Sequence, residues 1–391
     1  MGLKPSREQP SAGSVEHVRH EEIEATSPTS GPPEASRSRL ESLPPELFGL
    51  VAGLTPLKDR RALREVSTTI RALTIGFTTA VRGHDRGRLR DLERIYPALR
   101  DLDVSAYRGM KNGDAVAKVR DSSRMTPTET ADLVAMLHER RDLRSVQLHQ
   151  NFLGKNPERA IPILNALASV DALKMTNLAE NNLGSDASVT AAAIDFVKKA
   201  KNLASMNIND NFGEPDHENS TKMMGALREN KNITSLELRG NWLGWHPDGA
   251  DALAKMLGKD GSLKLKSIDL GDNFSSRRAQ NAVTILHALR DNTTLESAGL
   301  AKNELGRSEL TANATFDMLR TNRTLESVDL KGNGLGMARD RNLVEPLAAA
   351  LRENTNLKSI DLRDNGFSAE ELDVLSKLAE ETGKTILTDT I

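Results

Sequence analysis

The stretch Leu357-Lys-Ser-Ile360-Asp-Leu362-Arg-Asp-Asn365-Gly-Phe367 carries apolar residues around an alternating core and then reaches an asparagine. The alternation Ile360-Asp-Leu362 predicts a short strand with one buried face. The asparagine can bond backbone groups that the following turn leaves unpaired, because a buried polar group without a partner is costly. An equivalent asparagine recurs every 30 or 32 residues, at Asn151, Asn181, Asn211, Asn241, Asn273, Asn303, Asn333 and Asn365.

A helical pattern fills the interval between successive strands. Its last apolar residue precedes the first leucine of the next strand by six positions in most repeats, and a second apolar column lies one turn earlier. This spacing places both columns on one face of a helix. We expect Asn230, Asn292, Asn322 and Asn354 to end their helices in the left-handed conformation that asparagine tolerates. The first column is Leu137, Leu167, Val197, Leu227, Leu257, Leu289, Leu319 and Leu351.

The pattern L-x-x-I-x-L-x-x-N-x-Φ, in which Φ is apolar, resembles the leucine-rich repeat. The length of the repeat resembles that of the ribonuclease-inhibitor class. This resemblance implies an α/β fold, a leucine-rich-repeat solenoid shaped like a horseshoe with a parallel concave sheet and convex helices. The stack has to bend because helices need about twice the lateral spacing of strands. The stretch Gly249-Ala-Asp-Ala-Leu-Ala254 also resembles the GALA-type effectors of plant-pathogenic bacteria, which join an F-box to such repeats.

Composition narrows the classes of function. The chain has 391 residues, a formal net charge of −2 at pH 7 and no cysteine. The near-neutral charge gives no reason to expect binding to nucleic acid or to a bare membrane surface, and no apolar run approaches the roughly 18 residues of a membrane span. Without cysteine there are no disulfides, thiolate zinc sites or cysteine nucleophiles. Because the motifs of metalloproteases, phosphate-binding loops and hydrolases are also missing, we expect no enzyme activity, cofactor or metal. We also expect a monomer.

The first 39 residues are rich in Ser, Pro, Glu and Gly, and we expect them to form a disordered tail. Its opening, Met1-Gly2-Leu3-Lys4-Pro5-Ser6, fits the short N-myristoylation pattern, so Gly2 is a candidate lipidation site and the only reason to expect a membrane contact. The tail also resembles the Ser-rich leader of a type III secreted effector. That resemblance implies secretion by a bacterium into the cytoplasm of a host cell, or to a host membrane if Gly2 is lipidated.

Residues 40–75 contain two short amphipathic segments. Leu47, Val51 and Leu54 have the spacing of one helical face, and Leu63 and Val66 begin a second such face. The pattern L-P-x-E-L…V…L…L…V resembles an F-box, a helical module that binds the Skp adaptor of cullin-RING ubiquitin ligases. Ile70 departs from the tryptophan that is common in the family. The alternative is a helical cap on the first repeat. The residues that would contact the adaptor are Leu43, Pro44, Glu46, Leu47, Val51, Leu54, Leu63 and Val66.

Residues 76–130 connect this module to the repeats. The segment from Thr74 to Asp103 interleaves arginines with acids, so we expect a solvated helix there. Leu99, Leu102 and Val104 indicate a strand at its end, and an insertion of 14 residues follows. We expect the solenoid proper to span residues 131–391, with a last helix from Glu370 to Thr382 that shields its open end.

The variable positions of the strands face outward and offer a polar surface. Glu237, Asp269, Asp329 and Asp361 form an acidic stripe beside bases such as Arg239, which indicates a docking surface for a protein. The alternative is that neighbouring charges pair with each other. Trp242 and Trp245 lie in one turn, and tryptophan is favoured at binding hot spots. Packing of one ring over the adjacent helix is the alternative there.

These features lead to one functional hypothesis and its rivals. The first is a protein-binding adaptor that recruits a host Skp-cullin ubiquitin ligase through residues 43–73 and holds an unknown host target protein on the solenoid. The alternative is a regulatory binding module similar to ribonuclease inhibitor or to the Ran GTPase-activating protein, without recruitment of a ligase. A purely structural scaffold is the third.

Overall fold

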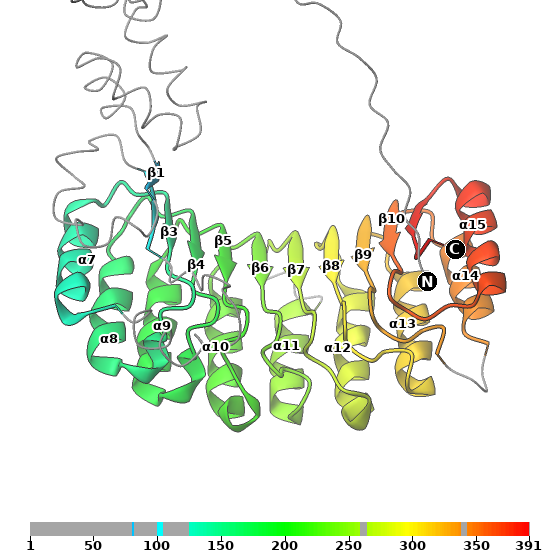
Figure 1. Ribbon diagram of the computed structural model, residues 1–391, viewed down its shortest axis with the longest axis horizontal. Helices are drawn as coiled ribbons and strands as arrows, with labels where there is room; N and C mark the ends of the chain where they lie inside the picture. Colours follow the sequence, from blue (N-terminus) through cyan, green and yellow to red (C-terminus); the bar gives the residue numbers. More distant parts are fainter. Residues whose placement is uncertain (1–79, 82–99, 105–124, 259–263, 338–341, 391) are drawn as a thin grey trace, which may run out of the picture.

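The computed structural model describes residues 80–81, 100–104, 125–258, 264–337 and 342–390. Within these ranges, eleven strands form a single parallel sheet in which every strand pairs with its neighbours in sequence order. Figure 1 shows the strands along the inner side of an arc and the helices along the outer side. The predicted α/β solenoid with a concave sheet is confirmed.

The strands are short and the helices behind them are longer. The strands are β1 (Ala80–Val81), β2 (Asp101–Asp103), β3 (Ser145–Gln147), β4 (Met175–Asn177), β5 (Ser205–Asn207), β6 (Ser235–Glu237), β7 (Ser267–Asp269), β8 (Ser297–Gly299), β9 (Ser327–Asp329), β10 (Ser359–Asp361) and β11 (Thr385–Leu387). The helices are α7 (Pro127–Glu139), α8 (Pro157–Leu167), α9 (Ala187–Lys199), α10 (His217–Glu229), α11 (Pro247–Leu257), α12 (Ala279–Asp291), α13 (Glu309–Thr321), α14 (Val344–Glu353) and α15 (Ala369–Thr382). None of these helices is both long and apolar enough to cross a bilayer.

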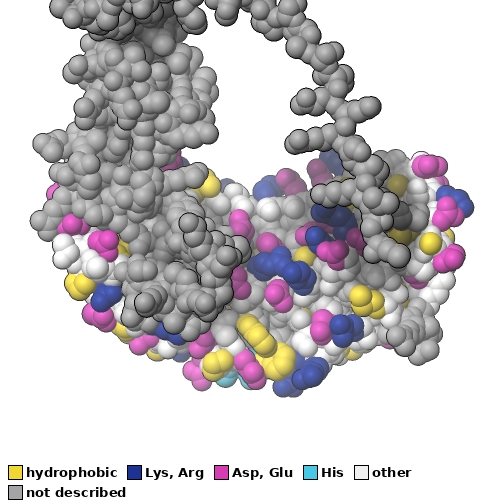
Figure 2. Space-filling view, viewed as in Figure 1, with side chains coloured by type: hydrophobic (Ala, Val, Ile, Leu, Met, Phe, Trp, Pro, Cys, Tyr) yellow, Lys and Arg dark blue, Asp and Glu magenta, His cyan; other side chains and the backbone are white. Residues whose placement is uncertain are grey.

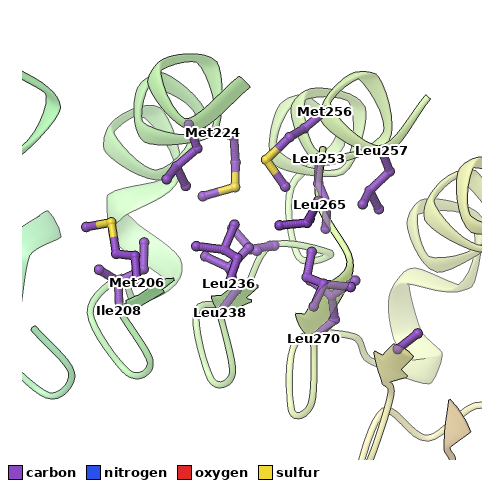
Figure 3. Packing of buried hydrophobic residues seen from close by; sticks show 14 of the residues in the cluster. Met206, Ile208, Met224, Leu236, Leu238, Leu253, Met256, Leu257, Leu265 and Leu270 are labelled. Carbon is purple, nitrogen blue, oxygen red and sulfur yellow. The ribbon is translucent and has the colours of Figure 1, made fainter. Parts of the chain in front are cut away.

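The core lies between the sheet and the helix layer. Figure 3 shows side chains from strands and helices of neighbouring repeats meeting in this layer, among them Leu236, Leu253 and Met256, each at most 2% exposed. The core is continuous along the described solenoid because every repeat buries its apolar face against the next one. Met206 and Met224 are also buried in this layer, and the flexible methionine side chain adapts to irregular spaces in a core.

The repeated asparagine is buried and bridges adjacent repeats, and we call the row of these residues from Asn151 to Asn365 the asparagine ladder. The Nδ2 of Asn333 donates to Leu300 O at 2.9 Å and to Leu330 O at 2.8 Å. Its Oδ1 accepts from Asn303 N at 2.9 Å and from Leu305 N at 3.3 Å. Each such asparagine therefore bonds its own turn, as the pattern predicted, and also the turn of the preceding repeat, which the pattern did not predict.

The asparagines that follow the helices form a second ladder, and the expectation of a left-handed cap was wrong. Asn322 has an extended backbone, with φ −64° and ψ 135°. Its Nδ2 donates to Leu289 O at 2.9 Å in the previous repeat, and its Oδ1 accepts from Thr324 N and Leu325 N, each at 2.8 Å. Asn230, Asn292 and Asn354 are extended in the same way. Bonds to the neighbouring repeat and to the next turn decide this conformation.

Both ends of the described sheet extend beyond the repeats. The connector, expected to be helical, contributes β1, which pairs with β2 through Ala80 and Asp101. The predicted strand near Leu102 is confirmed as β2. Helix α15 matches the predicted last helix and begins with a capping box between Ser368 and Glu371. Strand β11 follows it and adds a rung to the sheet that the repeat pattern did not predict.

Candidate protein-binding site

Three carboxylates of the predicted acidic stripe hydrogen-bond the backbone of their own strand ends. Oδ1 of Asp269 accepts from Gly271 N at 2.8 Å, and Oδ1 of Asp329 accepts from Lys331 N at 2.8 Å. Asp361 makes the same bond to the backbone of Arg363 at 3.1 Å. These carboxylates therefore fix the point where each strand leaves the sheet, which a carboxylate or an amide can do in this position.

The predicted acidic stripe is partly neutralised. Arg363 donates from its guanidinium to both oxygens of Asp361, and these bonds lower the pKa of that carboxyl. Glu237 accepts from Asn207 at 2.5 Å. Asp269 and Asp329 have no ion pair with another described residue. The alternative that neighbouring charges pair is thus correct for Asp361 and not for these two.

The residues directly before the repeated asparagines form a second row of outward-facing positions, which we call the turn column. Residues at this position have positive φ, between 55° and 70°, in every repeat from Gln150 to Asp364. Their side chains leave the chain at the edge of the concave face, just beyond the strands. The column is Gln150, Glu180, Asp210, Gly240, Asp272, Lys302, Gly332 and Asp364.

Trp242 and Trp245 meet at this edge, as the sequence suggested. Their ring centroids lie 5.2 Å apart in an edge-on arrangement. Trp242 has φ 55° and is 47% exposed, so its ring is presented outward rather than packed on the helix behind it. Together with Phe274 the two rings line a pocket of about 280 Å³, whose other side chains are Asp210, Asp272, Asn273, Ser275, Lys302 and Glu304.

The turn that carries the two tryptophans is held on several sides. Trp245 N donates to Trp242 O at 2.9 Å, which closes the turn. Leu243 lies between the two tryptophans in the sequence and is buried. Its N–H donates to Oδ1 of the ladder residue Asn273 at 3.2 Å. From α12, Asn281 donates to Gly244 O at 3.0 Å. These bonds fix the turn, so the two tryptophan rings are held in place before a partner binds.

Carboxylates give the pocket its electrostatic character. Partial desolvation in the pocket raises the pKa of Asp210, and the charges of Glu180 and Asp272 raise it further, while Arg239 lowers it. Neither Asp210 nor Asp272 has an ion pair or a side-chain hydrogen bond to another described residue. Glu304 differs, because bonds from the backbone and hydroxyl of Ser276 lower its pKa. The site has an excess of negative charge beside exposed aromatic rings.

The structure sorts the predicted site residues into three groups. Trp242 and Trp245 line the pocket, and Arg239 lies close to it, since its guanidinium is 2.9 Å from the place where a Cβ on Gly271 would stand. Glu237, Asp269, Asp329 and Asp361 lie on the strands and do not line it. The adaptor-binding residues from Leu43 to Val66 and the lipidation site Gly2 lie outside the described residues.

Sequence reasoning missed the four charged residues of the pocket. Asp210, Asp272 and Lys302 belong to the left-handed turn column, and Glu304 follows the next ladder asparagine. The regular spacing of that column was visible in the sequence, but its exposure depends on the turn conformation. Figure 2 shows apolar, acidic and basic side chains adjoining one another near the middle of the solenoid. Among the described side chains there is no group of three or more acids and histidines placed to hold a metal ion.

Comparison with known proteins agrees with this architecture. The family described as "Leucine Rich repeat" matches residues 321–336 and 353–370. The described fold is a leucine-rich-repeat solenoid. No curated protein sequence matches the chain. Stacked repeats of this kind present an extended concave surface for binding other proteins.

Two solved structures resemble the solenoid at low sequence identity. The structure of Rad7 in complex with Elc1 from yeast has a TM-score of 0.47 and 12% identity, over 92% of this chain and 88% of that chain. Leiomodin-1 Actin-Binding Site 2 has a TM-score of 0.28 and 17% identity, over 49% of this chain and 87% of that chain.

Proposed function

We propose that the protein is a two-ended adaptor. Its solenoid binds a target protein, and residues 43–73 bind a Skp-type adaptor of a cullin-RING ubiquitin ligase. The observation that carries the first half is the exposed ring of Trp242 in a preformed pocket at the concave edge. Tryptophan in a pocket of this kind is typical of the few residues that supply most of the affinity of a protein interface.

The second half of the proposal rests on the sequence. Leu43, Pro44, Glu46 and Leu47 fit the F-box pattern, and they precede a solenoid whose free surface is suited to holding a substrate. In such an arrangement the solenoid selects the protein and the helical module delivers it to the ligase.

We place this adaptor in a host cell. The Ser-rich tail and the GALA-like stretch at Gly249–Ala254 support delivery by a bacterium into the host cytoplasm. Myristoylation of Gly2 would move the protein to a host membrane. Intact mass measurement after expression in eukaryotic cells decides this point, because the lipid adds a fixed mass to the first residue left after Met1 is removed.

The test is binding of the purified full-length chain to a purified Skp protein. We expect the wild type to bind and the double variant Leu43→Ala/Pro44→Ala to lose at least about tenfold in affinity, since two apolar anchors are removed. Leu310→Ala is the matched control, because Leu310 is 48% exposed on the solenoid and lies far from residue 43 in the sequence.

The outcomes separate the hypotheses. If the wild type does not bind a Skp protein, the recruitment half of the proposal is wrong, and a regulatory binding module without ligase recruitment is left. If the double variant binds as tightly as the wild type, residues 43–73 are not the contact.

A further inference from the structure

The pocket at the concave edge contains both tryptophans of the chain. One of them already holds a cation. The guanidinium carbon of Arg278 lies 5.4 Å from the centroid of the Trp245 ring, within the range of a cation–π contact. The neighbouring ring of Trp242 has no such contact with a described cation and is 47% exposed. An aromatic surface suited to a positive charge is therefore available on Trp242.

The absence of a side chain at Gly240 lets the carboxylate of Asp210 lie beside this surface. Gly240 occupies the left-handed turn position between Asp210 and Asp272, with φ +67°. A Cβ at Gly240 would lie only 2.1 Å from Oδ1 of Asp210. The carboxylate of Asp210 therefore lies over the space that any other residue at position 240 would occupy. This places it on the side of its turn that faces Trp242 and Asp272.

The cations near the pocket do not pair with these two acids. The Cγ of Lys302 lies 3.2 Å from the place of a Cβ on Gly332, so its side chain lies along the following turn. Arg239 lies over Gly271 and affects Asp210 only through space. Neither residue comes within ion-pair distance of Asp210 or Asp272 in the described part of the chain. Two carboxylates thus face the pocket without a direct cationic partner.

We infer that this pocket binds an arginine side chain of the target protein. The inference rests on the proposed function, in which the solenoid binds a target, and it specifies the chemistry of the contact. A guanidinium is planar and can lie on the Trp242 ring while its N–H groups reach the two carboxylates. The pocket has a volume of about 280 Å³, which is room enough for one arginine side chain.

Arginine fits better than lysine because the carboxylates lie two turns apart. Asp210 and Asp272 lie in the turns that follow β5 and β7, which are separated by one intervening strand, and neighbouring strands are spaced by about 4.8 Å. The forked guanidinium has donors pointing in several directions, whereas an ammonium is a compact point charge. An arginine on the target can therefore contact both acids across the Gly240 turn, over which the Asp210 carboxylate already lies.

The experiment uses the intrinsic fluorescence of the full-length chain. Since Trp242 and Trp245 are its only tryptophans, a change in emission reports on this pocket alone. The probe is an acetylated and amidated pentapeptide with a central arginine flanked by serine and glycine. Matched peptides carry citrulline, which has the same shape without the charge, or lysine. We expect saturable binding of the arginine peptide, weaker binding of lysine, and at least about tenfold weaker binding of citrulline.

Variants test the two carboxylates. Asp210→Asn/Asp272→Asn should weaken binding of the arginine peptide at least about tenfold, since hydrogen bonds to charged groups are lost. The control, Asp364→Asn/Asp373→Asn, removes the same number of charges at the far end of the solenoid. Asp364 is in the same turn column, and Asp373 is on α15. All four positions are exposed, and an unchanged melting temperature shows that the fold is intact.

Three results would overturn the inference. They are equal binding of the citrulline peptide, binding of lysine as tight as arginine, or equal losses in the pocket variant and the control. Capture of a target from host extract separates this failure from failure of the proposed function. If the pocket variant loses the peptide but still captures the target, the arginine contact is wrong and target binding stands. If the wild type captures no target, the proposed function fails.

Discussion

Replacing Asn333 by alanine tests the ladder that holds the repeats together. Asn333 is 1% exposed, and its Oδ1 is the acceptor for Asn303 N and Leu305 N. Alanine leaves both buried N–H groups without this partner. Each such group costs about 1–3 kcal/mol, so we expect Asn333→Ala to lower the free energy of unfolding by about 2–6 kcal/mol.

The carbonyl groups on the other side limit the loss. Leu300 O also accepts from the side chain of Asn303 at 3.0 Å, and Leu330 O also accepts from that of Asn365 at 3.0 Å. Both acceptors therefore keep one donor after the substitution. This redundancy is why only the two N–H groups enter the expected magnitude.

Urea denaturation followed by far-ultraviolet circular dichroism measures the change. The control is Asn202→Ala, because the Nδ2 of Asn202 donates to Asp171 O at 2.8 Å in an exposed position. We expect this variant to lie within about 0.5 kcal/mol of the wild type. A loss below about 1 kcal/mol in Asn333→Ala, or one equal to that of the control, would refute the reasoning.

Three more predictions concern single positions. Asp210→Asn should leave the melting temperature unchanged or raise it by about 1–2 °C, since the raised pKa means that the charged form disfavours folding at neutral pH. A Cβ on Gly336 would lie 2.5 Å from Phe367 N, so Gly336→Ala should lower the free energy of unfolding by about 1–3 kcal/mol. Gly225→Ala on the exposed face of α10 should raise the free energy of unfolding by about 0.4–1 kcal/mol, and urea denaturation measures both changes. The lowered pKa of Asp361 means that its stabilising contribution is present above about pH 4 and is lost as the pH falls further, so thermal melts of Arg363→Gln should lose less stability over that range than those of the wild type.

Most of the fold could be predicted because one physical requirement recurs in every repeat. A buried asparagine at a constant spacing fixes the strand, the turn and the register at once, as the pairing of Ser359 with Ser327 shows. The helix columns follow from the same spacing. Strands β1 and β11 lie outside this repetition, and two or three residues carry too little pattern to indicate a strand.

The conformation of Asn322 could not be predicted from its position after a helix. Asparagine tolerates the left-handed region, but here its amide reaches Leu289 O in the previous repeat and its oxygen holds the next turn. Partners 33 residues away in sequence decide the outcome. Local preference was overruled by a contact between repeats.

The candidate site was half visible in the sequence. Tryptophan at positions 242 and 245 indicated the turn that forms one wall of the pocket, because two large rings in one turn are unusual. The carboxylates of Asp210 and Asp272 were missed, since the strand pattern says nothing about a left-handed turn before the asparagine. The space left by Gly240 is likewise a property of the packed turns.

The most direct test of the adaptor proposal is a quantitative capture from eukaryotic cell extract. The baits are the wild-type chain, Leu43→Ala/Pro44→Ala and Asp210→Asn/Asp272→Asn, and mass spectrometry measures the Skp protein and the other captured proteins. We predict that the first variant loses the Skp protein and keeps a target, while the second keeps the Skp protein and loses that target. Loss of both proteins in either variant, or recovery of neither with the wild type, would contradict an adaptor with two separate binding ends.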